Sequence, residues 1–244
     1  MSRVREAGQV SMQKAVEEEP LALSAAGIVK SYRGPGGVLE VLRGVDLEVR
    51  RGTILAILGV SGAGKSTLLN ILGTLDRPDR GTLAIRGRRV DGLGEEELAG
   101  LRARRIGFVF QFHHLLPEFT AEENVMMPLL IAGEGEAPAR ARAREALASV
   151  GLSERWEHRP SELSGGEAQR VAVARALAPE PELVLADEPS GNLDPGAARQ
   201  LQDLLASLAR DKHQTFVIVT HNDRLASLAD RVLTLESGRL VATP

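Results

Sequence analysis

The order of hydrophobic and polar positions predicts short buried strands separated by amphipathic helices. Residues 54–58, 183–186 and 216–219 are continuously apolar, which is typical of strands that are buried on both faces of a parallel sheet. Residues 45–50 alternate strictly between apolar and polar, and residues 82–86 do so more weakly. Because such alternation indicates antiparallel strands with one face in water, the chain is expected to contain two kinds of sheet.

Helical periodicity follows in two regions. Residues 95–105 and 137–152 show charged helical patterns, and residues 106–110 between them have the pattern of a strand, so a largely helical insertion is predicted here. A closing hairpin is expected at residues 231–242. In the helix predicted at 196–210, four leucines form one stripe that can cover a sheet face: Leu201, Leu204, Leu205 and Leu208.

The composition narrows the range of functions. Thirty basic and thirty-three acidic side chains leave a formal charge of −3, so we expect no nucleic acid partner. The absence of cysteine excludes disulfides and thiolate metal sites, and the adjacent His113 and His114 form no zinc motif. No segment approaches the roughly eighteen apolar residues of a membrane helix, and the start of the chain lacks the apolar centre of a signal peptide. We therefore expect a protein that stays inside the cell, with residues 1–20 as a flexible tail.

A phosphate-binding loop lies between the strand at 54–58 and a helix that is predicted to begin near Lys65. The loop fills every fixed position of the pattern Gly-x-x-x-x-Gly-Lys-Ser, and its glycines allow several backbone N–H groups to point inward. Lys65 is expected to reach the β- and γ-phosphates, Ser66 to ligate Mg²⁺ and Thr67 to support the phosphates. The alternative is a glycine-rich turn with a surface lysine. The residues predicted to bind nucleotide here are Gly59, Val60, Ser61, Gly62, Ala63, Gly64, Lys65, Ser66 and Thr67.

Two predicted strands end in side chains that can do chemistry. Asp187 and Glu188 follow one strand, and His221 follows another. In an open parallel sheet these ends meet at the edge that the P-loop marks. Asp187 is suited to hold Mg²⁺ through water and Glu188 to polarise the attacking water, whereas ordinary polar strand ends are the alternative. For His221 two roles stay open, which are contact with the γ-phosphate and orientation of Glu188 and the water.

A second anion-binding helix start is predicted at Ser164, Gly165, Gly166 and Glu167. Ser164 and Glu167 have the spacing of a capping box, and the two glycines leave backbone N–H groups uncovered. Because the P-loop already serves the chain's own nucleotide, this second start is expected to bind a nucleotide held by another subunit. The hypothesis predicts a homodimer that sandwiches two nucleotides; the alternative is an ordinary helix cap.

Together these motifs resemble those of the ATP-binding cassette ATPases from about Leu21 to the C-terminus. GVSGAGKST, Gln111, LSGGEAQR, LVLADEP, the SGNLD segment at 190–194 and His221 occur in the order of that family. The resemblance implies ATP hydrolysis with ATP and Mg²⁺ as cofactors. The catalytic residues that it implies are Lys65, Glu188 and His221, and the metal-binding residues are Ser66, Gln111 and Asp187.

The same resemblance implies a fold and further contacts. Tyr32 would stack on adenine, Gln111 would sense the γ-phosphate and Mg²⁺, and Asp194 would lie at the dimer seam. The signature residues Ser164, Gly165, Gly166 and Glu167 would face the partner's nucleotide. The expected fold is an α/β P-loop NTPase core with a mixed, mainly parallel sheet, an antiparallel β subdomain and an inserted helical subdomain. We expect the core at 21–91 and 167–244, and the insertion at about 92–166.

A narrower resemblance covers residues 112–125, FHHLLPEFTAEENV. This segment is similar to the ATPases of lipoprotein-releasing systems, and the His113-His114 pair is the feature that favours them. The resemblance implies a peripheral protein at the cytoplasmic face of the inner membrane, working with integral membrane permease subunits that handle the lipoprotein cargo. Macrolide-type efflux ATPases and ATPases of a non-transporting cell-division scaffold share Leu-Leu-Pro and Glu-Asn-Val and stay as alternatives.

Seven apolar side chains after Gln111 leave two interpretations open. They form either helical core around Pro128 or, in part, a groove for a cytoplasmic helix of a permease. The side chains are Phe112, Leu115, Leu116, Met126, Met127, Leu129 and Leu130. In the next helix, arginines at 140, 142 and 144 are expected on a solvated face rather than against an anionic partner, because residues two apart diverge on a helix.

Overall fold

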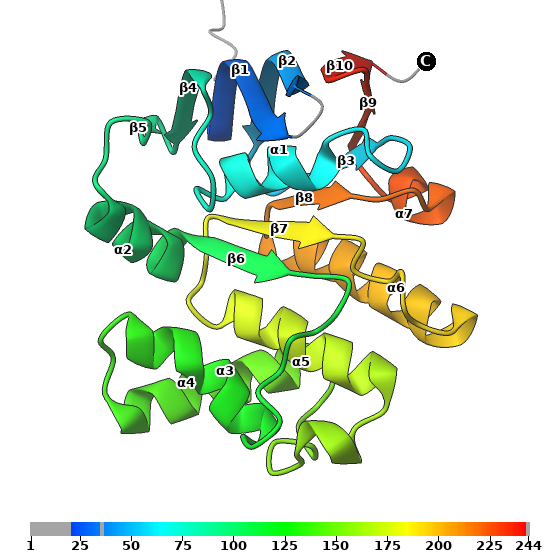
Figure 1. The fold of residues 1–244 in the computed structure, drawn as a ribbon. Coiled ribbons are helices and arrows are strands. Elements are labelled where there is room, and N and C mark those ends of the chain that lie inside the picture. The colour runs from blue at the N-terminus through cyan, green and yellow to red at the C-terminus, as the bar shows by residue number, and fades with distance from the viewer. Residues whose placement is uncertain (1–20, 35–36, 243–244) are drawn as a thin grey trace, which may run out of the picture.

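The structure is a computed structural model that describes residues 21–34 and 37–242. A six-stranded sheet forms its centre (Figure 1), in the order β10-β9-β3-β8-β7-β6, and every neighbouring pair is parallel except β9 with β10. The carboxyl ends of the parallel strands therefore lie at one edge. The strands are β3 (Ile54–Leu58), β6 (Ile106–Val109), β7 (Leu183–Asp187), β8 (Phe216–Val219), β9 (Arg231–Glu236) and β10 (Arg239–Ala242).

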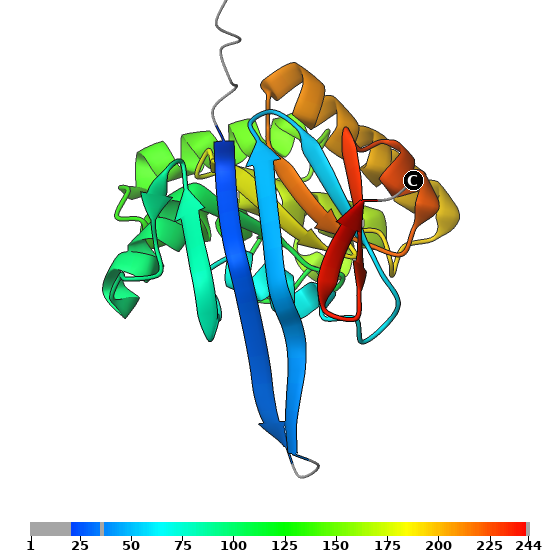
Figure 2. The same cartoon turned by 90° about the horizontal axis from the view of Figure 1, so that it is seen from above.

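A second, four-stranded antiparallel sheet lies across the first. Its order is β2-β1-β4-β5, and Figure 2 shows β1 and β2 as a long hairpin that extends beyond the other strands. In β2, Val45, Leu47 and Val49 are buried and the residues between them are exposed, as the alternation predicts. The strands are β1 (Leu21–Gly34), β2 (Gly37–Arg50), β4 (Arg80–Ile85) and β5 (Arg88–Arg89).

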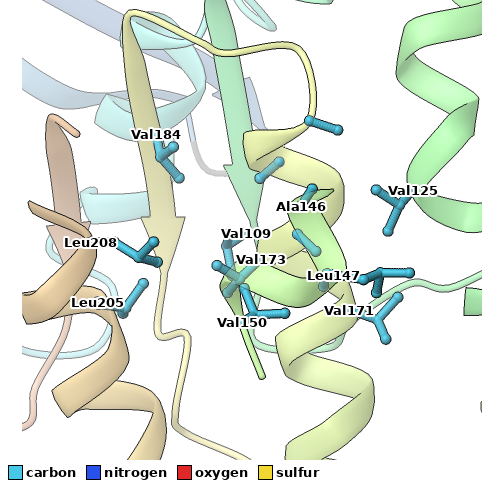
Figure 3. Packing of buried hydrophobic residues seen from close by; sticks show 14 of the residues in the cluster. Val109, Val125, Ala146, Leu147, Val150, Val171, Val173, Val184, Leu205 and Leu208 are labelled. Carbon is cyan, nitrogen blue, oxygen red and sulfur yellow. The ribbon is translucent and has the colours of Figure 1, made fainter. Parts of the chain in front are cut away.

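The central sheet is buried on both faces, which explains its continuously apolar strands. In β7, Leu183 and Leu185 point toward α1 (Lys65–Leu72), which packs between the two sheets, while Val184 and Ala186 point to the opposite face. On that opposite face, α6 (Pro195–Lys212) contributes Leu205 and Leu208 beside Val184 (Figure 3). Because both faces are covered, the strand ends at the sheet edge are held by well-packed side chains on either side of the sheet.

Three helices form a separate layer beyond the sheet (Figure 1). They are α3 (Ala121–Ile131), α4 (Glu136–Ser149) and α5 (Gly165–Leu177), and they share one apolar cluster with the sheet. The carboxylate of Glu122, only 3% exposed, accepts hydrogen bonds from Arg140 and Arg144. The expected solvated arginine face is therefore only partly right, because side chains four residues apart in α4 reach the same buried carboxylate.

Two further helices and one 3₁₀ turn complete the described structure. They are α2 (Glu95–Arg105), α7 (Asp223–Ser227) and a 3₁₀ turn, η1 (Pro160–Glu162). No helix in the described ranges is long and apolar enough to cross a membrane. The predicted tail at 1–20 lies outside the described residues.

The predicted architecture of two sheets and a helical layer is present. The structure adds two details to the sequence patterns. Pro128 lies inside α3 and does not begin a helix, because the helix is capped earlier by Thr120, whose hydroxyl accepts from the N–H of Glu123. The predicted insertion at 92–166 also contains β6, which pairs with β7 in the central sheet. The boundary of a helical subdomain therefore stays a prediction.

Candidate nucleotide site

The P-loop turns tightly between β3 and α1. Gly64, directly before α1, has a φ of 98°, and a Cβ there would lie 2.7 Å from the Val41 side chain. Glycine meets both conditions because it lacks a Cβ. Nζ of Lys65 lies 2.7 Å from the carbonyl oxygen of Gly59, so its ammonium group sits over the loop. A phosphate group binds well at a helix start that has no side-chain cap and has a positive charge nearby, and the start of α1 has both features.

An open cavity of about 870 Å³ lies in front of this loop. Of the predicted nucleotide and catalytic residues, all but Ala63 line it: Tyr32, Gly59, Val60, Ser61, Gly62, Gly64, Lys65, Ser66, Thr67, Gln111, Asp187, Glu188 and His221. Sequence reasoning missed Val41 and Phe110 as cavity residues, and it assigned Phe112 and His114 to other roles. Only the fold brings these four residues to the cavity.

Asp187 and Ser66 form the part of the cavity that suits a hard cation. Burial raises the pKa of Asp187, and its hydrogen bond with Ser66 opposes that rise. Within the described residues, no three His, Asp or Glu side chains gather into a metal cage. The oxygens of the Asp187 carboxylate and the Ser66 hydroxyl are hard ligands of the kind that Mg²⁺ takes from a protein, while phosphate oxygens and water complete its octahedron. The donor set therefore fits Mg²⁺ together with a nucleotide.

Glu188 is held by two partners from the end of β8. Its Oε2 accepts a hydrogen bond of 2.9 Å from the hydroxyl of Thr220, and its Oε1 lies 2.7 Å from Nδ1 of His221. The backbone of Glu188 has a φ of 45°, an unusual value for a residue with a side chain. His221 thus contacts Glu188 directly, and its two roles, toward the γ-phosphate and toward Glu188 and the water, stay predictions. Sequence reasoning gave Thr220 no role.

Gln111 joins the segment after β7 in a reciprocal amide pair. Its Nε2 donates to Oδ1 of Asn192 at 2.9 Å, and Nδ2 of Asn192 donates to the carbonyl oxygen of Gln111 at 3.3 Å. A Cβ at Gly191 would lie 3.1 Å from the same Nε2, so the glycine makes room for the pair. Gln111 thus lies at the cavity wall, in contact with the segment that leads to Asp194.

Tyr32 lies at the outer end of the cavity. Its hydroxyl donates to Oδ2 of Asp76 at 2.8 Å, and Nζ of Lys30 lies 5.2 Å from the centre of its ring. The ammonium of Lys30 also contacts Asp76 at 2.7 Å. The ring is 42% exposed and is therefore open on the cavity side. Asp76 and Lys30 hold its orientation, although neither belongs to a recognisable motif.

The second helix start lies apart from this cavity. Ser164 caps α5, and neither it nor Gly165, Gly166 or Glu167 is among the side chains that line the cavity. Asp194 caps α6 by accepting from the N–H groups at 196 and 197, at 2.9 and 3.0 Å. The two caps are neighbours, because a Cβ on Gly166 would lie 3.0 Å from the Ala197 side chain. The two helix starts that are predicted to bind anions therefore lie apart in the chain.

The apolar residues after Gln111 divide into core and surface. Leu115 (8% exposed), Met126 (3%) and Leu129 are buried, so the expectation of exposed docking positions is wrong for them. Leu116 (41% exposed) and Ile131 (71%) instead line a cavity of about 490 Å³ between α2, β6 and α3. Within α3 the difference follows the helix period, because the face that carries Met126 and Leu129 packs toward α4 and α5. Leu115 and Leu116 precede this helix.

Comparison with known proteins identifies the family. Residues 42–191 match the family model for the ABC transporter domain. The chain is 53% identical to lipoprotein-releasing system ATP-binding protein LolD 2 of Chlorobaculum tepidum, covering 92% of this chain and 94% of the relative. It is 52% identical to the LolD protein of Porphyromonas gingivalis, covering 90% and 99%, and 54% identical to that of Alcanivorax borkumensis, covering 89% and 96%.

Solved structures agree with these relatives. A dimeric structure of MJ0796, a bacterial ABC transporter cassette, superimposes with a TM-score of 0.81 at 39% identity, over 89% of this chain and 96% of that one. A dimeric post-hydrolysis state of MJ0796 bound to ADP and Pi matches with the same TM-score at 37% identity, over the same shares of both chains. The fold agrees with both comparisons, and the chain belongs to the ABC transporter family as one of its ATP-binding cassette ATPases.

Proposed function

We propose that this chain is the ATP-hydrolysing subunit of a lipoprotein-releasing transporter. The observation that carries the proposal is identity above 50%, over nearly the full length of both chains, to ATP-binding proteins named for that system. The subunit would work as a homodimer at the cytoplasmic face of the inner membrane, bound peripherally to integral permease subunits. The permeases would handle the lipoprotein, and ATP binding would close the dimer.

In this proposal each chain binds ATP mainly through its own P-loop. The backbone N–H groups of the loop and the ammonium of Lys65 take the β- and γ-phosphates, while the ring of Tyr32 stacks on adenine. Ser66 and Asp187, with Gln111, would hold Mg²⁺, which neutralises charge on the phosphates when it is bound. The raised pKa of Asp187 supports this role, because a cation nearby relieves the cost of keeping the buried carboxylate charged.

Hydrolysis in this proposal depends on Glu188. Its carboxylate would accept a hydrogen bond from the attacking water and orient it toward the γ-phosphate. Thr220 and His221 hold the two carboxylate oxygens at 2.9 and 2.7 Å and so limit the rotamers of the side chain. An oriented acceptor lowers the barrier because the water is already positioned before reaction.

The signature residues would complete the partner's site. Ser164, Gly165, Gly166 and Glu167 lie outside the chain's own nucleotide cavity. A second subunit related by a two-fold axis would bring them to the γ-phosphate, with Asp194 at the seam. The dimeric MJ0796 structures support this arrangement for a cassette of the same fold.

Permease docking is proposed for the cavity between α2, β6 and α3. Leu116, Met127, Pro128 and Ile131 supply its apolar lining, and Arg102 and Arg175 are its charged side chains. An exposed apolar hollow beside Gln111 is suited to transmit closure to an inserted helix. Ile131→Glu should therefore abolish copurification with the permeases and lipoprotein release from reconstituted vesicles, while folding and basal ATPase activity stay normal.

The matched control is Val241→Glu on β10, which also places a charge at an exposed apolar position but far from the hollow. It should copurify normally. If Ile131→Glu still releases lipoprotein, the docking site is misplaced. If the wild-type complex transports a macrolide, or signals without transport, and releases no lipoprotein, one of the alternative functions replaces the proposal.

A further inference from the structure

The start of α5 carries a negative charge beside the hydroxyl that is proposed to meet the partner's phosphate. Oε2 of Glu167 accepts from the hydroxyl of Ser164 at 2.8 Å and from its backbone N–H at 2.9 Å. The backbone N–H of Glu167 in turn donates to the Ser164 hydroxyl at 3.2 Å. This capping box stabilises the helix, but its carboxylate would repel an approaching phosphate.

Within the described part of the chain, one cationic side chain pairs with that carboxylate. Nε of Arg155, from the segment between α4 and η1, donates to Oε1 of Glu167 at 3.0 Å. Each carboxylate oxygen of Glu167 thus has its own partner: Oε2 bonds Ser164 and Oε1 bonds Arg155. The hydrogen bonds with Ser164 and Arg155 lower the pKa of Glu167 to about 2, so it is fully charged near neutral pH.

Arg155 is itself positioned by the helical layer. Its neighbour Trp156 accepts, at its carbonyl oxygen, a hydrogen bond of 2.9 Å from the N–H of Glu122. The Trp156 ring also lies under the guanidinium of Arg144, 3.9 Å from the ring centre. The segment that carries Arg155 is therefore attached to both α3 and α4.

We propose that Arg155 is a positioning residue for the trans site: it neutralises Glu167 and holds it as the cap of Ser164, so that the helix start attracts the partner's γ-phosphate. The inference rests on the proposed homodimer and concerns how its trans site attracts the γ-phosphate. Because Arg155 acts through the charge of Glu167, its importance must vanish when that charge is removed. A structural role for Arg155 would persist whatever residue 167 is.

The test uses the full chain carrying Glu188→Gln, in which ATP-driven dimers should accumulate. Dimer dissociation constants are measured in Mg-ATP by sedimentation, and ATP binding to the monomer by calorimetry. Arg155→Ala should weaken the dimer about tenfold, because the pair is lost at both symmetric sites, and should leave monomer ATP affinity unchanged. Adding Glu167→Gln should restore the dimer, since glutamine still caps the helix without a charge.

The controls separate the possible failures. Arg155→Lys should retain most of the dimer affinity, and Arg159→Ala, an equal loss of charge on the same segment, should have no effect. A dimer that Arg155→Ala leaves intact, or that Glu167→Gln does not restore, overturns the inference. If Ser164→Arg also leaves the dimer intact, the proposed trans site itself fails.

Discussion

The two helix starts that are proposed to bind phosphate differ in what supports them. The start of α1 has no side-chain cap and follows a strand that is buried on both faces. The start of α5 is capped by its own Ser164 and Glu167, and its support comes from partly exposed side chains. The N–H groups of the first start thus depend on water or a ligand, whereas the second start has an internal partner in Ser164.

This difference indicates that the two helix starts have different roles in nucleotide binding. The uncapped start lies beside Asp187 and Glu188 in one cavity of the same chain, so each chain is expected to hold a nucleotide mainly through its own residues. A capped start must exchange an internal hydrogen bond for one to the partner's phosphate, so its binding is reversible. Three experiments test this contrast.

The largest effect is expected at the sheet edge. Glu188→Gln keeps the shape of the side chain but removes the charge that orients water, so ATP turnover should fall by about three orders of magnitude or more. ATP affinity should be retained and closed dimers should accumulate. Single-turnover hydrolysis and calorimetry measure the two properties separately. Near-normal turnover would show that another group positions the water.

Mixed dimers compare the two starts directly. Lys65→Ala removes a charge from the bound phosphates and should weaken ATP binding by roughly ten- to a hundredfold. Ser164→Arg fills the other start with a bulky side chain. In a dimer of one subunit of each kind, one composite site keeps both intact halves and the other carries both lesions. Calorimetry should find one ATP per mixed dimer, and two would mean that the signature segment acts within its own chain.

The smallest effect concerns the cap of α5 as a function of pH. The pKa of Glu167 is about 2 in the folded chain, against 4.5 without its partners. Because the folded value is depressed, the stabilisation is present above pH 4.5 and is lost as the pH falls toward 2. Wild type should melt about 2 °C above Glu167→Gln at pH 6, and this gap should shrink below pH 4.5. A gap that is constant with pH would assign the effect to packing.

Much of the fold and of the first site follows from local patterns. Continuous apolar runs marked strands that are buried on both faces, and strict alternation marked β2. The spacing of the P-loop and the acidic and histidine residues after strands identified Lys65, Ser66, Asp187, Glu188 and His221 as neighbours. These patterns are informative because a parallel sheet brings the carboxyl ends of its strands to one edge.

Other features depended on contacts between distant segments. The sequence patterns did not distinguish the buried Leu115 and Met126 from the exposed Leu116 and Ile131, because the burial of each depends on where α4 and α5 lie. Arg155 and Asp76 carry no motif, yet each holds a residue that does.

The sequence by itself thus determined the family, the nucleotide loop and the strand-end carboxylates, since these depend on residues within one strand, turn or helix. Only the tertiary structure decided which partners hold Glu188, Tyr32 and Glu167 in place. Four of these partners, Thr220, His221, Asp76 and Arg155, lie 12 to 44 residues away in the chain, and no local pattern of hydrophobicity or spacing encodes a contact across that separation.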